Sequence, residues 1–277
     1  MKDRVKALLG AHGITAVAAI ALTDVTVTRP YLLERQGITA GTAFLFAVPY
    51  YTTDCDANTR NISAYAVSRD YHGFFAAVFA DVLPCLKAEF QKNTFAGFAD
   101  HSPIAEVEAA VKAGLGVLGK NHLFLSHAHG SYAFLGEIIT DALLETTVSP
   151  LTACADCGAC ARACPVGLDV TRCLSALTQR KGALTAGEQA ALLAHGMAWG
   201  CDRCQEVCPH NRAAREAGGL YTEIPYFKES AIPHLTAAMI ETMSDEEFAA
   251  RAYSWRGRAV ILRNLALLEA SKTPTNS

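Results

Sequence analysis

Short apolar runs recur along the first half of the chain at lengths that suit strands rather than helices. Runs of four to eight apolar residues that are bounded by turn residues are typical of buried strands. Four stretches fit this description: "ITAVAAIAL" from Ile14, "TAFLFAVPYY" from Thr42, "TFAGFAD" ending at Asp100, and "GSYAFLGEIIT" from Gly130. We therefore expect four strands in this part of the chain.

Apolar residues at helical spacing separate these strands. The stretch from Asp70 to Gln91 has this spacing, and Pro84 is the expected kink or boundary. A second helix is expected to start at Ser102-Pro103, because serine is a favoured N-cap and proline is favoured at the first helical position. Its apolar face would consist of Ile104, Val107, Val111 and Leu115. The alternation predicts an α/β (α+β) N-terminal domain with a mixed sheet.

The pattern changes twice further along the chain. Residues 1–147 would form the α/β domain, in which we expect the substrate and any cofactor to bind. Residues 148–217 lose the strand pattern and contain most of the cysteines, which predicts a separate ferredoxin-like domain. Residues 218–277 have a mostly helical pattern and form a predicted C-terminal helical segment.

The N-terminus, "MKDRVKALLGAHGITAVAAIALTD", has a basic start and an apolar run, as a signal peptide does. Gly13 and Asp24 interrupt that run, which favours a short amphipathic helix followed by a buried strand. No apolar run approaches the ~20 residues that a transmembrane helix needs. We therefore expect no membrane association and a cytoplasmic location.

Cysteine is the unusual feature of the composition. The chain has 277 residues, 51% of them hydrophobic, and a net charge of −3, which as a whole does not indicate nucleic-acid binding. Eight of its 10 cysteines fall between Cys154 and Cys208, whereas Cys55 and Cys85 stand apart and are expected to be ordinary thiols. Clustering within a larger chain favours metal binding in a reducing compartment over a disulfide framework.

The cysteine spacing indicates two 4Fe–4S clusters. The first run is C-x2-C-x2-C-x3-C-P from Cys154, and the second is C-x2-C-x3-C-P from Cys201. In two-cluster ferredoxins the cysteine before proline ligates the other cluster. One predicted set is therefore Cys154, Cys157, Cys160 and Cys208, and the other is Cys164, Cys173, Cys201 and Cys204. Two structural zinc sites are the alternative, but the triple C-x2-C-x2-C followed by C-P is much rarer in them.

Several motifs together resemble the epoxyqueuosine reductase family. They occur in the family's order over most of the chain: "RDYH", "AGLGVLGKN", "GSYAFLGEIITD", "CLSALTQRKG", "GCDRCQEVCPHN" and "SWRGRAVILRN". The resemblance implies reduction of epoxyqueuosine in tRNA to queuosine, by a cobalamin that two 4Fe–4S clusters supply with electrons. It also implies an external electron donor such as flavodoxin or ferredoxin. The D-x-H-x-x-G corrinoid motif is absent, so a cobalamin would lack that motif's histidine ligand.

Asp100 matches the family's catalytic aspartate. Loss of an epoxide oxygen leaves negative charge on oxygen, and a positioned acid must protonate it. Without the resemblance, an aspartate that caps the next helix would be the simpler interpretation. The resemblance also implies cofactor or substrate contacts for Ser63, Tyr71, His72, Lys120, Asn121 and Ser131. Without the resemblance, Tyr71 and His72 would be interpreted as a helix start, and Lys120, Asn121 and Ser131 as parts of turns.

Four arginines without an acid between them follow Phe248: Arg251, Arg256, Arg258 and Arg263, with Trp255 among them. They could form a phosphate-contacting patch for RNA or a solvated helix face.

Two departures from the family bear on the substrate. Full-length members continue into a C-terminal helical repeat domain that helps to hold tRNA, whereas this sequence stops soon after "RN", and the loop between Cys164 and Cys173 is shorter. The alternatives are a corrinoid and iron–sulfur reductase of another small molecule or of a corrinoid protein, and a non-catalytic 4Fe–4S electron carrier.

Overall fold

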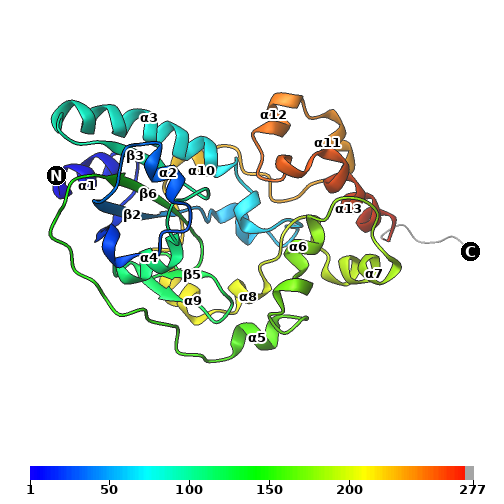
Figure 1. The fold of residues 1–277 in the computed structure, drawn as a ribbon. Helices are drawn as coiled ribbons and strands as arrows, with labels where there is room; N and C mark the ends of the chain where they lie inside the picture. Colours follow the sequence, from blue (N-terminus) through cyan, green and yellow to red (C-terminus); the bar gives the residue numbers. More distant parts are fainter. Residues whose placement is uncertain (272–277) are drawn as a thin grey trace, which may run out of the picture. The chain divides into compact units, whose positions relative to one another are not determined.

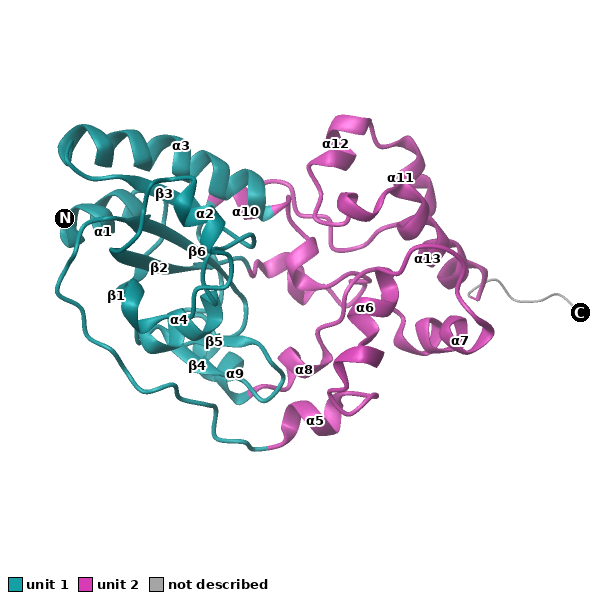
Figure 2. Ribbon diagram, viewed as in Figure 1, with its two compact units in different colours: residues 1–50, 71–157, 209–224 teal, residues 51–70, 158–208, 225–277 magenta. Residues whose placement is uncertain are grey.

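The computed structural model describes residues 1–271 and divides into two compact units (Figure 2). Unit 1 contains residues 1–50, 71–157 and 209–224, and unit 2 contains residues 51–70, 158–208 and the chain from residue 225 onward. The two units thus interleave along the chain. The linear division after residues 147 and 217 stays a prediction.

Unit 1 is an α/β unit (Figure 1). Its elements are α1 (Lys2–Gly10), β1 (Ala16–Ala21), η1 (Leu22–Asp24), α2 (Pro30–Glu34), β2 (Thr42–Pro49), α3 (Tyr71–Glu89), β3 (Phe95–Phe98), α4 (Glu106–Lys112), β4 (Gly116–Leu118), β5 (Phe124–Ser126), β6 (Ala133–Thr140) and α9 (Pro209–Glu216). The four strands expected from the sequence are β1, β2, β3 and β6.

Unit 2 is built from short helices. Its elements are η2 (Thr53–Asp56), η3 (Ala64–Ala66), α5 (Ala159–Ala163), η4 (Val170–Arg172), α6 (Leu174–Thr178), α7 (Ala186–His195), α8 (Arg203–Glu206), α10 (Pro225–Lys228), α11 (Ala237–Thr242), α12 (Asp245–Ala249), η5 (Ser254–Arg256) and α13 (Arg258–Ala270). The helical pattern predicted after residue 217 is confirmed from α10 to α13.

The main sheet of unit 1 has the strand order β1-β2-β6-β3. All three neighbouring pairs are antiparallel, so the prediction of a mixed sheet is wrong. Apolar composition identified the strands correctly, but strand direction depends on how the connections return to the sheet, which such runs do not encode. All eight residues of β2 are buried, as expected for a strand covered on both faces.

Helices cover both faces of this sheet. On one face, α4 packs against β2 and β6, and its Ala109, Ala110 and Val111 join Leu45 and Leu135 in the core. The other face meets the aromatic side chains of α3. Gly136 in β6 must be glycine there, because a Cβ would lie 2.2 Å from the ring of Phe75.

The predicted start of the second helix is wrong. Helix α4 begins at Glu106, not at Ser102-Pro103. The Ser102 hydroxyl instead bonds Ile104, accepting from its N–H and donating to its carbonyl oxygen. Such local side-chain bonds compete with helical ones. Helix α3 runs through Pro84 to Glu89, so this proline does not end the helix.

A hairpin that the sequence analysis missed joins β4 to β5. The expected turn at Gly119-Lys120-Asn121 lies between these strands. Three-residue strands are too short to show the alternation that identifies a strand. Among residues 1–271, no helix is long and apolar enough to cross a membrane.

Candidate functional site

A pocket of about 200 Å³ in unit 1 gathers three of the predicted site residues: Tyr71, Asp100 and Ser131. Glu106, His122 and residues Ala133–Leu135 of β6 also line it. The loop after β3, the start of α3 and the start of β6 therefore converge on one cavity.

Asp100 has a backbone conformation that most residues avoid. Its φ is +64°, and His122 across the pocket has the same value. Aspartate and histidine enter this left-handed region more readily than most residues, but not without cost. The Asp100 side chain is 67% exposed, and its Oδ2 lies 3.7 Å from Nε2 of His72. The strained backbone thus holds an exposed carboxyl group in the lining of the pocket, near an imidazole.

Aromatic stacking fixes the pocket wall beside Asp100. The Tyr71 ring stacks on His72 and on Phe134 of β6, with ring centroids 4.2 Å apart in both pairs. Stacked aromatic pairs of this kind are favourable beyond the area that they bury. Tyr71 therefore lines the pocket with its ring held between two neighbours, and a contact of Tyr71 and His72 with a cofactor or substrate stays a prediction.

Glu106 was not identified from the sequence, although it lines the same pocket. Burial and, to a lesser degree, the charge of Asp100 raise the pKa of its carboxyl to about 7, against the opposing effect of Arg29. An acid with a pKa near neutral pH therefore lines the pocket together with the predicted catalytic aspartate.

Ser131 is buried at the start of β6 and is held by Asn211 of α9. Its N–H donates to Asn211 Oδ1 at 2.6 Å, and Asn211 Nδ2 donates to its hydroxyl at 2.9 Å. The preceding Gly130 has φ +60°, and a Cβ there would lie 2.0 Å from Asn211 Oδ1. Glycine is therefore required for this close approach. Asn211 belongs to the "CPHN" motif, which the sequence analysis used only for its cysteine.

Lys120 lies at the first cysteine motif rather than in the pocket. Its N–H donates to Cys154 Sγ at 3.4 Å, and its ammonium lies 2.6 Å from Asp156. The neighbouring Asn121 stays at the same turn, where its Oδ1 accepts from the N–H of Leu123. An N–H bond to sulfur is one of the features that set the potential of an iron–sulfur cluster. The β4–β5 turn therefore supports the thiol of Cys154.

Ser63 belongs to unit 2, where it contributes to a network around the second cysteine motif. Its hydroxyl donates to the buried carboxylate of Asp202, which lies between Cys201 and Cys204. Asp202 also accepts from Arg60, from the N–H of Ala64 and from Gln205. Because a buried carboxylate needs such partners, this network fixes the backbone of the motif.

The four cysteines of the second predicted set all lie in unit 2, whereas Cys154 and Cys157 of the first set lie in unit 1. Helix α5, which carries Cys160, packs against α8, which carries Cys204. Burial is the main cause that raises the pKa of the Cys201 thiol to about 11, and the nearby Cys173 is one of the smaller causes. The assignment of Cys173 and Cys201 to one set stays a prediction.

Among residues 1–271, no three His, Cys, Asp or Glu side chains are gathered as ligands of a single metal ion. A 4Fe–4S cluster makes a different demand on its ligands, because each thiolate binds its own iron and the four sulfurs stand farther apart. None of the ten cysteines, which all lie within residues 1–271, forms a disulfide.

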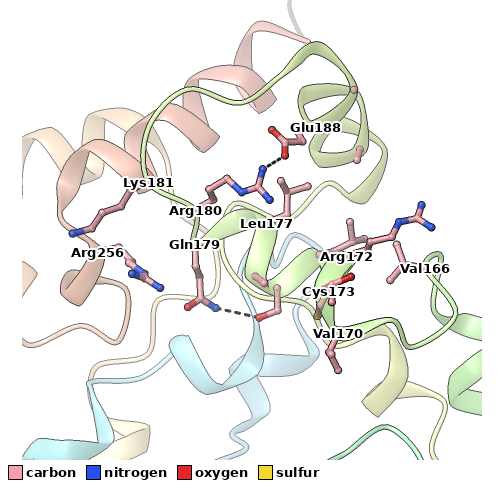
Figure 3. Close-up of a pocket in the computed structure, with 16 residues that line it drawn as sticks. Val166, Val170, Arg172, Cys173, Leu177, Gln179, Arg180, Lys181, Glu188 and Arg256 are labelled. Atoms are coloured by element: carbon pink, nitrogen blue, oxygen red, sulfur yellow. Dashed lines mark hydrogen bonds and ion pairs between the residues drawn. The ribbon is translucent and has the colours of Figure 1, made fainter.

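A second, larger pocket lies within unit 2 (Figure 3). It measures about 920 Å³, and Cys173 lines it together with Arg172, Arg180, Lys181 and Arg256. The one acid in its lining, Glu188, forms an ion pair with Arg180. The pocket is therefore positively charged beside a predicted cluster ligand.

Three of the four arginines after Phe248 do not form the predicted phosphate patch. Arg251 is buried and donates to the carbonyls of Ser230 and Val67. Arg258 donates to the carbonyls at the end of α11, and Arg263 to those of Arg180 and Gly182. Arg256 instead stacks on the exposed ring of Trp255, 3.6 Å from its centroid. The first three arginines thus stabilise the fold of unit 2.

No family model matches the chain, but curated relatives do. The epoxyqueuosine reductase of Cyclobacterium marinum is 34% identical over 211 residues, which are 72% of this chain and 64% of that protein. The chain belongs to the epoxyqueuosine reductase family. It spans less than two thirds of the length of this relative and of the Pseudomonas aeruginosa enzyme.

Solved epoxyqueuosine reductases share the fold. The Streptococcus thermophilus enzyme superposes with a TM-score of 0.76 at 22% identity, covering 100% of this chain and 82% of that one. An epoxyqueuosine reductase solved with an epoxyqueuosine-modified tRNA-Tyr stem loop gives a TM-score of 0.76 at 24% identity, covering 97% and 80%. Identities this low are informative about the fold alone.

Proposed function

We propose that the chain is an iron–sulfur reductase that removes the oxygen of an epoxide, with epoxyqueuosine in tRNA as substrate. Both C–O bonds of the epoxide break, an alkene forms, and the oxygen leaves as water. The balance requires two electrons and two protons. The observation that carries this proposal is the position of Asp100, which strained backbone holds at a pocket beside His72 and Glu106.

Asp100 would deliver protons to the epoxide oxygen. Its carboxyl is exposed and belongs to the pocket lining, so a bulky substrate could reach it from solvent, and the pocket would admit only a small ring of that substrate. A positioned general acid typically contributes ~10²–10⁴-fold to the rate. His72 would orient the Asp100 carboxyl, because its imidazole lies near one of the two oxygens.

The electrons would arrive through two 4Fe–4S clusters in a ferredoxin-like arrangement. Eight cysteines in the required spacing, none of them in a disulfide, support this assignment, as does the N–H bond from Lys120 to the Cys154 sulfur. The Asp202 network supports it too, because it holds the loop that carries Cys201 and Cys204 in one conformation. Assembly of such clusters requires reduced thiols, which fits the cytoplasm.

Cobalamin is the proposed cofactor between the clusters and the substrate. When bound, it would supply a cobalt centre that accepts electrons from the clusters and passes them on. The unit 1 pocket is smaller than the ~300–1,000 Å³ that ordinary ligands fill, so it suits a part of the substrate rather than a corrin ring. Tyr71, His72 and Ser131 are the proposed contacts at its edge. Contacts by Ser63, Lys120 and Asn121 rest on the family resemblance alone.

The basic pocket of unit 2 is the proposed docking place for the electron donor. Flavodoxin or ferredoxin would bring an acidic surface to Arg172, Lys181 and Arg256, next to Cys173. The tRNA partner is supported by the related reductase solved with a modified stem loop.

Anaerobic reconstitution with iron, sulfide and cobalamin tests the proposal directly. The loaded chain should convert epoxyqueuosine to queuosine in tRNA taken from a reductase-deficient strain. Uptake of cobalamin without conversion would favour a reductase of another substrate. Clusters that exchange electrons without any cobalamin uptake would favour an electron carrier.

A further inference from the structure

A carboxyl group is buried inside unit 1 without a cation to pair with among residues 1–271. Glu137 in β6 is 1% exposed, neither of its side-chain oxygens has a hydrogen bond of ordinary geometry, and the Ser102 hydroxyl is the polar side chain that acts on it. An unpaired carboxylate at such a position would be very costly, whereas a protonated carboxyl costs far less. Burial accordingly raises the pKa of Glu137 to about 8.

This buried acid continues the wall of the Asp100 pocket. Side chains of a strand alternate between its two faces, so Ala133, Leu135 and Glu137 share one face of β6. Ala133 and Leu135 line the pocket, and Glu137 is the next residue inward on that face. The start of α4, where Glu106 lies, covers the same face.

The three acids influence one another in sequence. The charge of Asp100 raises the pKa of Glu106, and the charge of Glu106 raises the pKa of Glu137. The other groups that act on them are Arg29, which lowers the pKa of Glu106, and Ser102, which lowers the pKa of Glu137. Asp100 and Glu106 line the pocket, and Glu137 follows the pocket residues Ala133 and Leu135 on one face of β6, so the three acids lead from the pocket to the core.

We propose that Glu106 and Glu137 store protons behind Asp100 and return them to it during each turnover. This inference rests on the proposed function, which consumes two protons for each epoxide. Asp100 gives a proton to the substrate oxygen and becomes a carboxylate. Glu106 then passes its proton to Asp100, directly or through one water, and Glu137 restores Glu106. The second proton follows the same route, the oxygen leaves as water, and solvent reprotonates the three acids after product release.

Titration of the two glutamates tests whether they hold protons, which a purely structural role for Glu106 would not require. Infrared spectroscopy of the full-length reconstituted protein, with carbon-13 at the glutamate δ position, distinguishes carboxyl from carboxylate. Two glutamates should lose their protons near pH 7 and pH 8. Asp100→Asn should lower the first of these pKa values, and Glu106→Gln should abolish the first transition and lower the second. If no glutamate of the wild-type protein has a pKa above the ordinary range for glutamate, the proposal is overturned.

Turnover provides the second measurement. Glu106→Gln should slow turnover at least about tenfold and remove the fall in rate as pH rises through 7, because the stored proton is gone. Glu106→Asp, which keeps an acid, should recover part of the rate. Glu108→Gln is the matched control: Glu108 lies on the same helix but pairs with Lys112, and its loss should change neither titration nor rate.

The two proposals fail in different ways. A wild-type chain that reduces epoxyqueuosine, with a Glu106→Gln variant of equal rate and pH profile, contradicts the proton store and leaves the proposed function standing. A wild-type chain that shows both raised pKa values but reduces no epoxyqueuosine contradicts the proposed function instead.

Discussion

The backbone N–H of Lys120 donates to the sulfur of Cys154 at 3.4 Å. This bond ties a hairpin turn of the α/β unit to the first cysteine of the cluster motif. The same residue also places its ammonium group 2.6 Å from Asp156, two residues after that cysteine. A positive charge near a cluster favours the reduced state, which carries one more electron.

Lys120→Ala should therefore lower the reduction potential of the nearby cluster. The ion pair is solvent-exposed and modest in strength, so we expect a change on the order of tens of millivolts. The backbone N–H remains in the variant, and cluster content should not fall. Asp156→Asn provides the opposite control, because it removes a negative charge from the same turn and should raise the potential. Redox titration followed by electron paramagnetic resonance measures both, and shifts of the same sign would contradict this account.

Replacement of Asp100 should abolish turnover without loss of the clusters. Asp100→Asn keeps the size and the tolerance for a positive φ but cannot donate as an acid, so we expect a fall of ~10²–10⁴-fold. Asp100→Gly relieves the backbone conformation and should be as inactive while at least as stable. Iron content and thermal denaturation serve as controls. Turnover close to wild type in Asp100→Asn would assign the acid role to another group.

The strands and the family could be predicted because they depend on local patterns, whereas the cysteine assignment stays a prediction. Apolar runs identified β1, β2, β3 and β6, and motif order identified the family. The functional surroundings of Asp100 could not be predicted, because they depend on contacts between distant residues. A single acid inside the apolar run "AFLGEIIT" was the available signal for Glu137, but a sequence does not show whether such an acid is paired.

The arginines near the C-terminus illustrate the same limit. Arg251, Arg258 and Arg263 looked like an RNA footprint because the intervening sequence contains no acid. Their partners are backbone carbonyl oxygens, which every sequence has and which only a folded chain gathers. The predicted helix start at Ser102 was wrong for a related reason, because the serine hydroxyl accepts a local hydrogen bond from the N–H of Ile104 instead.

The stability of the protein should depend on pH through Glu137. Its folded pKa of about 8 exceeds the ordinary value of 4.5, so the folded state holds a proton that the unfolded state releases between these limits. This contribution is fully present below pH 4.5 and is lost as pH rises through 8, at up to about 1.4 kcal/mol per pH unit. Glu137→Gln should flatten the dependence of Tm on pH across this window. A slope equal to that of wild type would contradict a buried, protonated Glu137.

Asn264 should be important for the stability of unit 2. Its side chain is fully buried and donates to the carbonyls of Thr178 and Ala198, which belong to the segments near Cys173 and Cys201. Asn264→Ala leaves both carbonyls without a donor and should cost about 1–3 kcal/mol. We expect a lower Tm and faster loss of iron. Asn58→Ala, at an exposed turn, is the control and should leave both unchanged. Equal stability of the two variants would show that the Asn264 bonds are replaceable.

Charge reversal at the basic pocket of unit 2 should slow the arrival of electrons. Arg172 and Lys181 are exposed beside Cys173, and the lone acid of the lining is already paired with Arg180. The double variant Arg172→Glu and Lys181→Glu should reduce the rate of cluster reduction by flavodoxin or ferredoxin about tenfold or more at low salt, and less at high salt. Reduction by dithionite, a small molecule, should be unaffected, and Lys92→Glu on unit 1 is the control for net charge. If donor rates are unchanged while tRNA binding weakens, the pocket binds RNA phosphates instead, and the donor must dock elsewhere.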